Sequence, residues 1–270
     1  MNPPLSSLWQ TKLPGNLDQR LQDLFEAAEK TPRPVRIFFR ADDIGRIENN
    51  FILLMQLFAD FDMPLCLALV PQWLSADNWQ QIRSLVKKED LFCWHQHGFN
   101  HINHEAVGKK CEFGESRSIE AIRKNILVGK LKLEQLLADS FLPVFTPPWN
   151  RCSKATMQVL QELNFPALSR SINVQPPPPA GLMDLAINID LHTRKENDPE
   201  QGMDNLLAEC KTALESGCMG FMLHHQRMNA TAFLFLEHLL GAINAESLLV
   251  PCTFRELLKN SCSQCAGSGR

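Results

Sequence analysis

Short apolar runs alternate with amphipathic stretches from residue 35 onward, and this alternation limits the fold more than any other feature of the chain. Runs typical of β-strands cover residues 35–40, 65–70, 91–94, 142–145, 166–169, 186–190 and 219–223. Apolar residues recur at helical spacing in residues 50–61, 78–88, 118–139, 154–163, 203–216 and 230–242. Several strands are apolar throughout, as expected of parallel strands that helices cover on both faces. The pattern predicts an α/β fold, a distorted (β/α) barrel of about seven parallel strands.

The same pattern divides the chain into three regions. Residues 1–34 form an N-terminal extension, residues 35–260 the barrel domain and residues 261–270 a flexible tail. An open doubly wound sheet is less compatible with the sequence, because no glycine-rich turn follows the first strand at Arg40. The tail contains Cys262 and Cys265, and a single Cys-x-x-Cys pair is only a weak signal for zinc or redox chemistry.

Charge and hydropathy exclude several classes of partner. The 270 residues include 27 Lys and Arg against 30 Asp and Glu, which gives a formal net charge of −3. This balance argues against nucleic acid as the main partner. No apolar run is long enough to cross a bilayer, and residues 1–5 are unlike a secretion signal. We therefore expect a cytoplasmic protein without membrane insertion.

Histidines gather where the predicted strands end. Seven of the eight follow a strand, and only His238 lies within a predicted helix; the seven are His95, His97, His101, His104, His192, His224 and His225. The carboxyl ends of barrel strands carry the active site in enzymes of this architecture. We therefore expect the chemistry of the protein at this end of the barrel.

Asp42 and Asp43 follow the first strand directly. Two adjacent carboxylates repel each other unless a positive charge compensates them. A metal ion could bind one carboxylate and leave the other free to act as a base. The alternative is an exposed acidic turn that caps the next helix.

His97 and His101 are four residues apart, with Gly98 between them. In a helical turn this spacing points two imidazoles the same way, so that together they can bind one ion. With a carboxylate they would form a three-ligand site that leaves a position for water, as catalytic zinc requires. The alternative is a histidine-rich surface loop.

Four short motifs stand in a fixed order at the strand ends. They are Asp42-Asp43, the H-G-x-x-H of residues 97–101, the Pro-Pro-Trp of residues 147–149 and the late Leu-His-His of residues 223–225. In this order they resemble the polysaccharide deacetylase family (NodB homology, carbohydrate esterase 4). The resemblance implies a distorted (β/α) barrel and a metal-dependent hydrolase that removes an acetyl or other acyl group from an amino sugar, an oligosaccharide or a glycan precursor.

The resemblance also implies roles for individual residues. Asp42 would be the catalytic base, and one divalent ion would bind Asp43, His97 and His101; zinc is the expected ion, with nickel, cobalt or iron as alternatives. The proton donor would be His225, with His224 left open because the histidine is doubled. The substrate would contact the residues Pro148, Trp149, Arg151 and Leu223, with Leu223 in the acetyl pocket. Trp73 and Trp94 are further candidates for stacking on a sugar ring, although Trp94 lies in an apolar strand.

One position departs from the family pattern. The family has an arginine that pairs with the base and keeps it ionised where this chain has Thr146. Arg151 could return to the site past the Pro-Pro turn, and Arg40 is its competitor because strand alternation puts it on the same side as Asp42. We predict that Arg151 takes the role, with capping of the turn as its alternative.

Two alternative functions remain. The Ala-Asp-Asp-Ile-Gly of residues 41–45 also resembles the YdjC-type chito-oligosaccharide deacetylases, which would act on short oligosaccharides. The other alternative is a non-catalytic barrel that binds a glycan or a metal, for which Thr146 is the only support.

Overall fold

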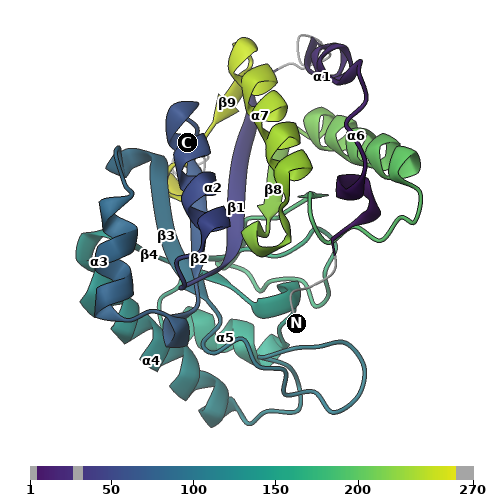
Figure 1. Ribbon diagram of the computed structural model, residues 1–270. Coiled ribbons are helices and arrows are strands. Elements are labelled where there is room, and N and C mark those ends of the chain that lie inside the picture. The colour runs from purple at the N-terminus through teal and green to yellow at the C-terminus, as the bar shows by residue number, and fades with distance from the viewer. Residues whose placement is uncertain (1–4, 27–32, 260–270) are drawn as a thin grey trace, which may run out of the picture.

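Nine strands, each parallel to its hydrogen-bonded neighbours, form one curved sheet in the order β6-β5-β4-β3-β2-β1-β8-β7, with β9 paired to β1. The computed structural model describes residues 5–26 and 33–259 (Figure 1). The strands are β1 (Val35–Ile44), β2 (Leu65–Leu69), β3 (Phe92–His97), β4 (Phe141–Thr146), β5 (Ala167–Leu168), β6 (Met183–Asp184), β7 (Ile189–Asp190), β8 (Cys218–Leu223) and β9 (Leu249–Pro251). The sheet confirms the predicted distorted (β/α) barrel, with nine strands where about seven were expected.

Among the described residues, 254–259 are helical, and seven further α-helices surround the sheet (Figure 1). They are α1 (Leu17–Glu26), α2 (Asn49–Asp60), α3 (Ala76–Ser84), α4 (Ile119–Leu137), α5 (Lys154–Glu162), α6 (Pro199–Glu215) and α7 (Ala230–Ala245). Five of them begin after a polar residue whose side chain accepts a hydrogen bond from a backbone N–H of the first turn; these residues are Ser75, Ser118, Ser153, Asp198 and Asn229. Such caps satisfy N–H groups that have no partner within the helix.

The N-terminal extension contains a helix that was not expected. In α1, Leu17, Leu21, Leu24 and Phe25 recur at helical spacing and are buried. The helix packs against α6 and α7, and the 3₁₀ turn η1 (Ser7–Gln10) packs against the same two helices. The described part of the extension therefore covers the outside of the barrel. The predicted tail, with Cys262 and Cys265, lies outside the described residues.

Strand β1 lies at the centre of the sheet and is buried on both faces. Phe39 stacks on Phe221 of β8 at 4.8 Å between ring centroids, within the large core under α2 and α7. Phe38 points the opposite way and packs against Phe254 in a second core. This double burial is the reason why residues 37–39 of the strand are apolar on both faces. Within residues 5–26 and 33–259, no helix combines the length and the apolar character that crossing a bilayer requires.

Gly220 gives a test of how tightly β8 packs beside β1. A Cβ atom at Gly220 would lie 2.6 Å from the backbone oxygen of Ala186 and would also overlap the ring of Phe38. We predict that Gly220→Ala lowers the free energy of unfolding by about 1–3 kcal/mol, because a close-packed core cannot absorb the extra carbon without shifting.

The control is Gly241→Ala in α7, where the new Cβ would meet only Phe61 at an ordinary 3.6 Å. Alanine favours a helix interior, so this variant should be unchanged or stabilised by about 0.5–1 kcal/mol. Urea unfolding of both variants measures the difference. Equal effects of the two substitutions would contradict the tight packing at Gly220.

Candidate functional site

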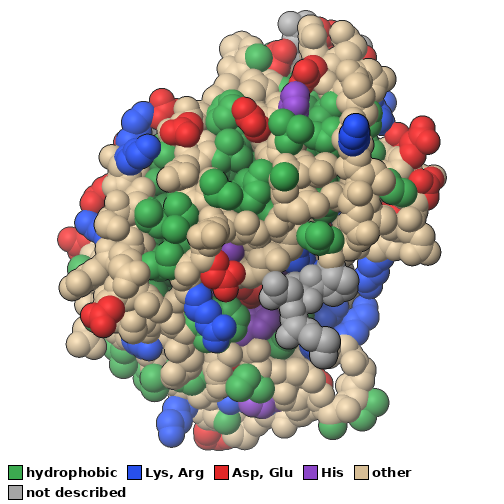
Figure 2. All heavy atoms as spheres, in the orientation of Figure 1, with side chains coloured by type: hydrophobic (Ala, Val, Ile, Leu, Met, Phe, Trp, Pro, Cys, Tyr) green, Lys and Arg blue, Asp and Glu red, His purple; other side chains and the backbone are tan. Residues whose placement is uncertain are grey.

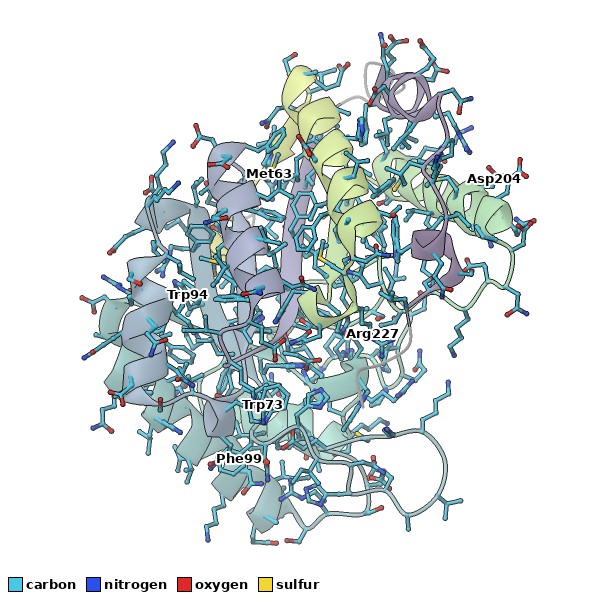
Figure 3. The ribbon with its side chains drawn as sticks, viewed as in Figure 1. Met63, Trp73, Trp94, Phe99, Asp204 and Arg227 are labelled. Carbon is cyan, nitrogen blue, oxygen red and sulfur yellow. The ribbon has the colours of Figure 1, made fainter. Side chains whose placement is uncertain are left out.

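A cleft of about 1100 Å³ opens at the carboxyl ends of the strands. Of the residues singled out in the sequence, the cleft is lined by Asp42, Asp43, His97, His101, Trp149, Arg151 and His224. Figure 2 shows histidine side chains beside acidic and basic ones in the lower half of the molecule, and in Figure 3 the cleft residues Trp73 and Arg227 are labelled. Pro148, Leu223 and His225 are not part of this lining.

A bulge in β1 brings both aspartates to the cleft. Adjacent residues of a regular strand point to opposite faces, so Asp42 and Asp43 would normally diverge. Here the register with β2 shifts between Ala41 and Ile44, and Asp43 adopts a positive φ of 63°. The extra residue changes the direction of the strand locally, as bulges do beside active sites. Both carboxylates therefore line the same cleft.

Asp43 lies between two histidines. Its Oδ1 atom is 3.1 Å from Nε2 of His97 and 3.1 Å from Nε2 of His101, and one potential ligand atom from each residue lies within 4.8 Å of the others. Burial acts to raise the pKa of Asp43, but the hydrogen bonds with His101 and His97 outweigh it and hold that pKa well below its usual value. The same contacts, against the effect of burial, raise the pKa of His97.

The donor set fits a divalent metal ion. His97 Nδ1 lies 2.9 Å from the backbone oxygen of Thr146, which can only accept, so Nδ1 carries the proton and donates. In the neutral ring, Nε2 then presents a lone pair to the Asp43 oxygen, and two acceptors in contact require a proton or a cation between them. Two imidazole nitrogens and one carboxylate form one of the ligand sets of catalytic zinc. The hydrogen bond from His97 Nδ1 to the backbone oxygen of Thr146 is of the kind that orients a metal-binding histidine.

The predicted helical turn between His97 and His101 is wrong. His97 ends β3, and the following loop has positive φ at Gly98 (56°) and at His101 (57°). A Cβ atom at Gly98 would lie 2.6 Å from the Pro148 ring and would overlap a carboxylate oxygen of Glu112. The two histidines therefore converge through a loop that requires glycine at residue 98. Pro148 packs against this loop and does not line the cleft.

Glu112 was not identified from the sequence, although it organises this loop. Its side chain is fully buried and accepts hydrogen bonds from the backbone N–H groups of Phe99 (3.3 Å), Asn100 (2.8 Å) and His101 (3.2 Å). The only signal in the sequence is a charged residue between two apolar ones, Cys111 and Phe113. That pattern marks a buried charge only when the surrounding fold is known.

Arg40, not Arg151, pairs with Asp42. The Arg40 Nε and Nη2 atoms each donate to one oxygen of Asp42 at 2.8 Å, and both side chains are almost completely buried. The remaining donors bind the oxygens of Ser169 at 2.9 and 3.0 Å and Oδ1 of Asn150 at 2.8 Å. All five N–H groups of the guanidinium are thus used, as a buried charge requires.

The prediction for Arg151 is therefore wrong. Arg151 lines the cleft, but its Nη1 donates to the backbone oxygen of Lys110 at 3.1 Å. Thr146, at the position of the family's arginine, turns its hydroxyl to Nε2 of His95 at 2.9 Å. Arg40 reaches Asp42 because both lie on one side of β1, two residues apart.

Of the two adjacent histidines, His224 lines the cleft and His225 does not. Met222 and His224 line the cleft, whereas Leu223 and His225 alternate with them and face the interior, with 0% and 1% of their surfaces exposed. His225 packs against the ring of Phe51, and burial lowers its pKa to about 4. Leu223 belongs to the main core and cannot form an acetyl pocket. The Nδ1 atom of His224 is buried, which leaves Nε2 as the ring nitrogen that faces the cleft.

Two tryptophans border the metal-ligand cluster. The ring centroid of Trp149 lies 4.5 Å from that of His101, and Trp73 lies 5.7 Å from it on another side. Both tryptophans are partly exposed and line the cleft. Trp94, in contrast, packs edge-on against Trp79 in the core. Aromatic faces available for a ligand are therefore limited, among these three, to Trp149 and Trp73.

Glu112 provides a test of how the histidine loop is held. We predict that Glu112→Gln weakens binding of a divalent ion about 10–100-fold, because an amide oxygen cannot replace a carboxylate that accepts three N–H groups around a ligand. Glu115→Gln, an exposed residue of the same loop, removes the same charge and should leave binding unchanged. Competition with a chromogenic chelator measures the affinities. Equal affinities in the two folded variants would remove this role from Glu112.

Comparisons with known proteins agree with the architecture. No protein-family model and no curated protein matches this chain. Among solved structures, it is similar to a candidate polysaccharide deacetylase from Mycobacterium smegmatis (TM-score 0.65, 13% identity, 87% of this chain and 93% of that one). It is also similar to a probable polysaccharide deacetylase from Pseudomonas aeruginosa PAO1 (TM-score 0.64, 14% identity, 90% of this chain and 98% of that one). A third similar structure is that of Puue allantoinase (TM-score 0.64, 13% identity, 89% of this chain and 97% of that one). The chain therefore has the NodB-like (β/α)-barrel fold that polysaccharide deacetylases share.

Proposed function

We propose that this protein is a metal-dependent hydrolase that removes an acetyl or other acyl group from the amine of an amino sugar, an oligosaccharide or a glycan precursor. The observation that carries the proposal is a carboxylate locked by a buried guanidinium, Asp42 with Arg40, beside a cluster of metal-ligand type on an open cleft. The shared fold supports it, although the same fold is found in an allantoinase, so the site and not the fold must identify the substrate.

Asp43, His97 and His101 would hold one divalent ion, with zinc proposed and nickel, cobalt or iron as alternatives. When bound, the ion polarises the acyl carbonyl and makes water more acidic. His97 is oriented for this role by its bond to Thr146, and His101 by the backbone contact of its loop with Glu112.

Asp42 is placed to take a proton from the attacking water. Arg40 fixes the plane of this carboxylate through two hydrogen bonds, which orients it to act as a base. His224 follows Leu223 of β8, which pairs with Ala41 of β1 just before Asp42, and it also lines the cleft. Its Nε2 atom can deliver a proton to the leaving amine. Trp149 and Trp73 offer apolar faces on which a sugar ring can stack.

The paired Asp42 also weighs against a barrel that only binds a glycan or a metal. Thr146 was the sole feature in favour of that alternative, and Arg40 supplies the guanidinium that Thr146 lacks. A binding protein would gain nothing from a second buried carboxylate beside the ligand cluster, because burying charge costs free energy.

The two aspartates should respond differently to the same substitution. We predict that Asp43→Asn loses both bound metal and acyl release, because it removes a ligand. Asp42→Asn should keep the metal and lose turnover by about 10²–10⁴-fold, which is the usual contribution of a general base. Elemental analysis and an acetate-release assay on both variants provide the measurements. Loss of metal to the same extent in both would reject the division of roles.

Arg40 and Arg151 can be separated in a parallel experiment. Arg40→Lys keeps the charge but not the planar fork, so we predict full metal content and a fall in kcat of about 10²-fold from misplacement of Asp42. Arg151→Lys, which changes an arginine outside this pair, should change kcat less than threefold. Metal content and thermal unfolding verify that both variants are intact. A larger loss of kcat in the Arg151 variant would show that Arg40 does not position the base.

A further inference from the structure

The cleft carries more positive charge than the rest of the chain would suggest. The whole chain has a formal net charge of −3. Nevertheless, five different strand-end loops each place one cationic residue on the cleft lining: Arg46 after β1, Lys109 after β3, Arg151 after β4, Lys195 after β7 and Arg227 after β8. Figure 2 shows Lys and Arg side chains on both sides of the histidines in this part of the surface.

The acidic residues of the lining do not balance these cations. Asp42 is neutralised by its bond to Arg40, and Asp43 by its two histidines or the ion they would hold. Two carboxylates remain, Glu48 and Asp190. Asp190 accepts hydrogen bonds from the backbone N–H groups of His192 and Thr193 and from the Thr193 hydroxyl, which occupies much of its acceptor capacity. Even with Arg227 set aside, four cations thus face two carboxylates.

The pairing of cations differs between the cleft and its surroundings. Within the described parts of the chain, no ion pair with a carboxylate is formed by four of these cations, Arg46, Lys109, Arg151 and Lys195. The Arg46 guanidinium lies over the ring of Trp73, with its carbon 5.3 Å from the ring centroid. Arg194, next to Lys195, is instead held by Glu196 and Glu209. Arg194 is therefore neutralised although it lies next to Lys195, whereas Arg46, Lys109, Arg151 and Lys195 have no carboxylate partner among the described residues.

Unneutralised cations around a concave site raise the local concentration of anions, because the low-dielectric walls focus the field. A neutral polysaccharide would gain nothing from this arrangement, whereas an anionic ligand would relieve the repulsion among the cations. Building on the proposed acyl hydrolysis, we propose that the substrate is an acylated amine that also carries an anionic group, either phosphate or carboxylate, which the Arg46, Lys109, Arg151 and Lys195 side of the cleft recognises.

The test compares acyl release from neutral and anionic substrates by the full-length, metal-loaded protein. The neutral substrates are N-acetylglucosamine and di-N-acetylchitobiose; the phosphate arm uses N-acetylglucosamine 1-phosphate, its 6-phosphate and UDP-N-acetylglucosamine, and the carboxylate arm N-acetylmuramic acid. We expect kcat/KM for at least one anionic substrate to exceed that of the neutral sugars about tenfold or more, and this advantage to fall as salt screens the charges. The arm that shows the advantage identifies the anion.

Charge-removing variants connect this preference to the cleft. Lys109→Gln and Lys195→Gln should each reduce the ratio of anionic to neutral kcat/KM about threefold, as expected for a charge contact made by an exposed lysine. Lys110→Gln, the neighbour of Lys109 that lies outside the cleft lining, should leave the ratio unchanged. A ratio that falls equally in all three variants would assign the preference to overall charge and overturn the proposal.

A binding measurement separates this inference from the proposed function. Calorimetric titration compares the affinities of the metal-free protein for N-acetylglucosamine 6-phosphate and for N-acetylglucosamine. Because no metal is present, a contact between phosphate and metal cannot contribute to the difference. Equal turnover of neutral and anionic substrates overturns the inference and leaves the proposed function intact. If no substrate releases acetate, the proposed function fails. In that case tighter binding of the anionic sugar still supports the charge recognition, and equal binding of the two sugars overturns it.

Discussion

The buried ion pair between Arg40 and Asp42 is the interaction on which the geometry of the cleft depends. Its guanidinium joins β1 to Ser169 after β5 and Asn150 after β4, and Nη2 also contacts the sulfur of Met222 in β8 at 3.1 Å. Removing one partner of such a pair leaves an uncompensated buried charge, which typically costs about 3–5 kcal/mol. The position of the Asp42 carboxylate is therefore coupled to the way in which the strand ends close around it.

Strain in the backbone gathers at the same place. Among the described residues, eight that are not glycine have positive φ, and five of these line the cleft: Asp43, His101, Trp149, Asn150 and Asn173. Each such conformation costs on the order of 1–3 kcal/mol and persists only where the surrounding structure enforces it. The paired strands beneath the cleft and the hydrogen bonds of Glu112 supply that enforcement, so that ligand side chains from separate loops converge.

Much of the architecture could be predicted because local composition determines it. A continuously apolar strand such as β2 and an amphipathic helix such as α4 have the period and length expected of a covered parallel sheet. Elements that tertiary contacts define were missed. Strand β6 is only two residues long and exists through pairing with β5, and β9 exists through pairing with the first residues of β1. Helix α1 was missed although its apolar spacing was readable.

The sequence by itself determined the chemistry of the site: which residue types stand at the strand ends and in what order. It could not decide which way each side chain points, because alternation along a strand holds only while the register is regular. The bulge at Asp42 and Asp43 breaks that rule, whereas the residues directly after β8 continue its alternation, so that His224 lines the cleft and His225 is buried. Only the tertiary structure assigned the guanidinium partner, because reach depends on where strands and turns lie in space and not on the number of residues between them.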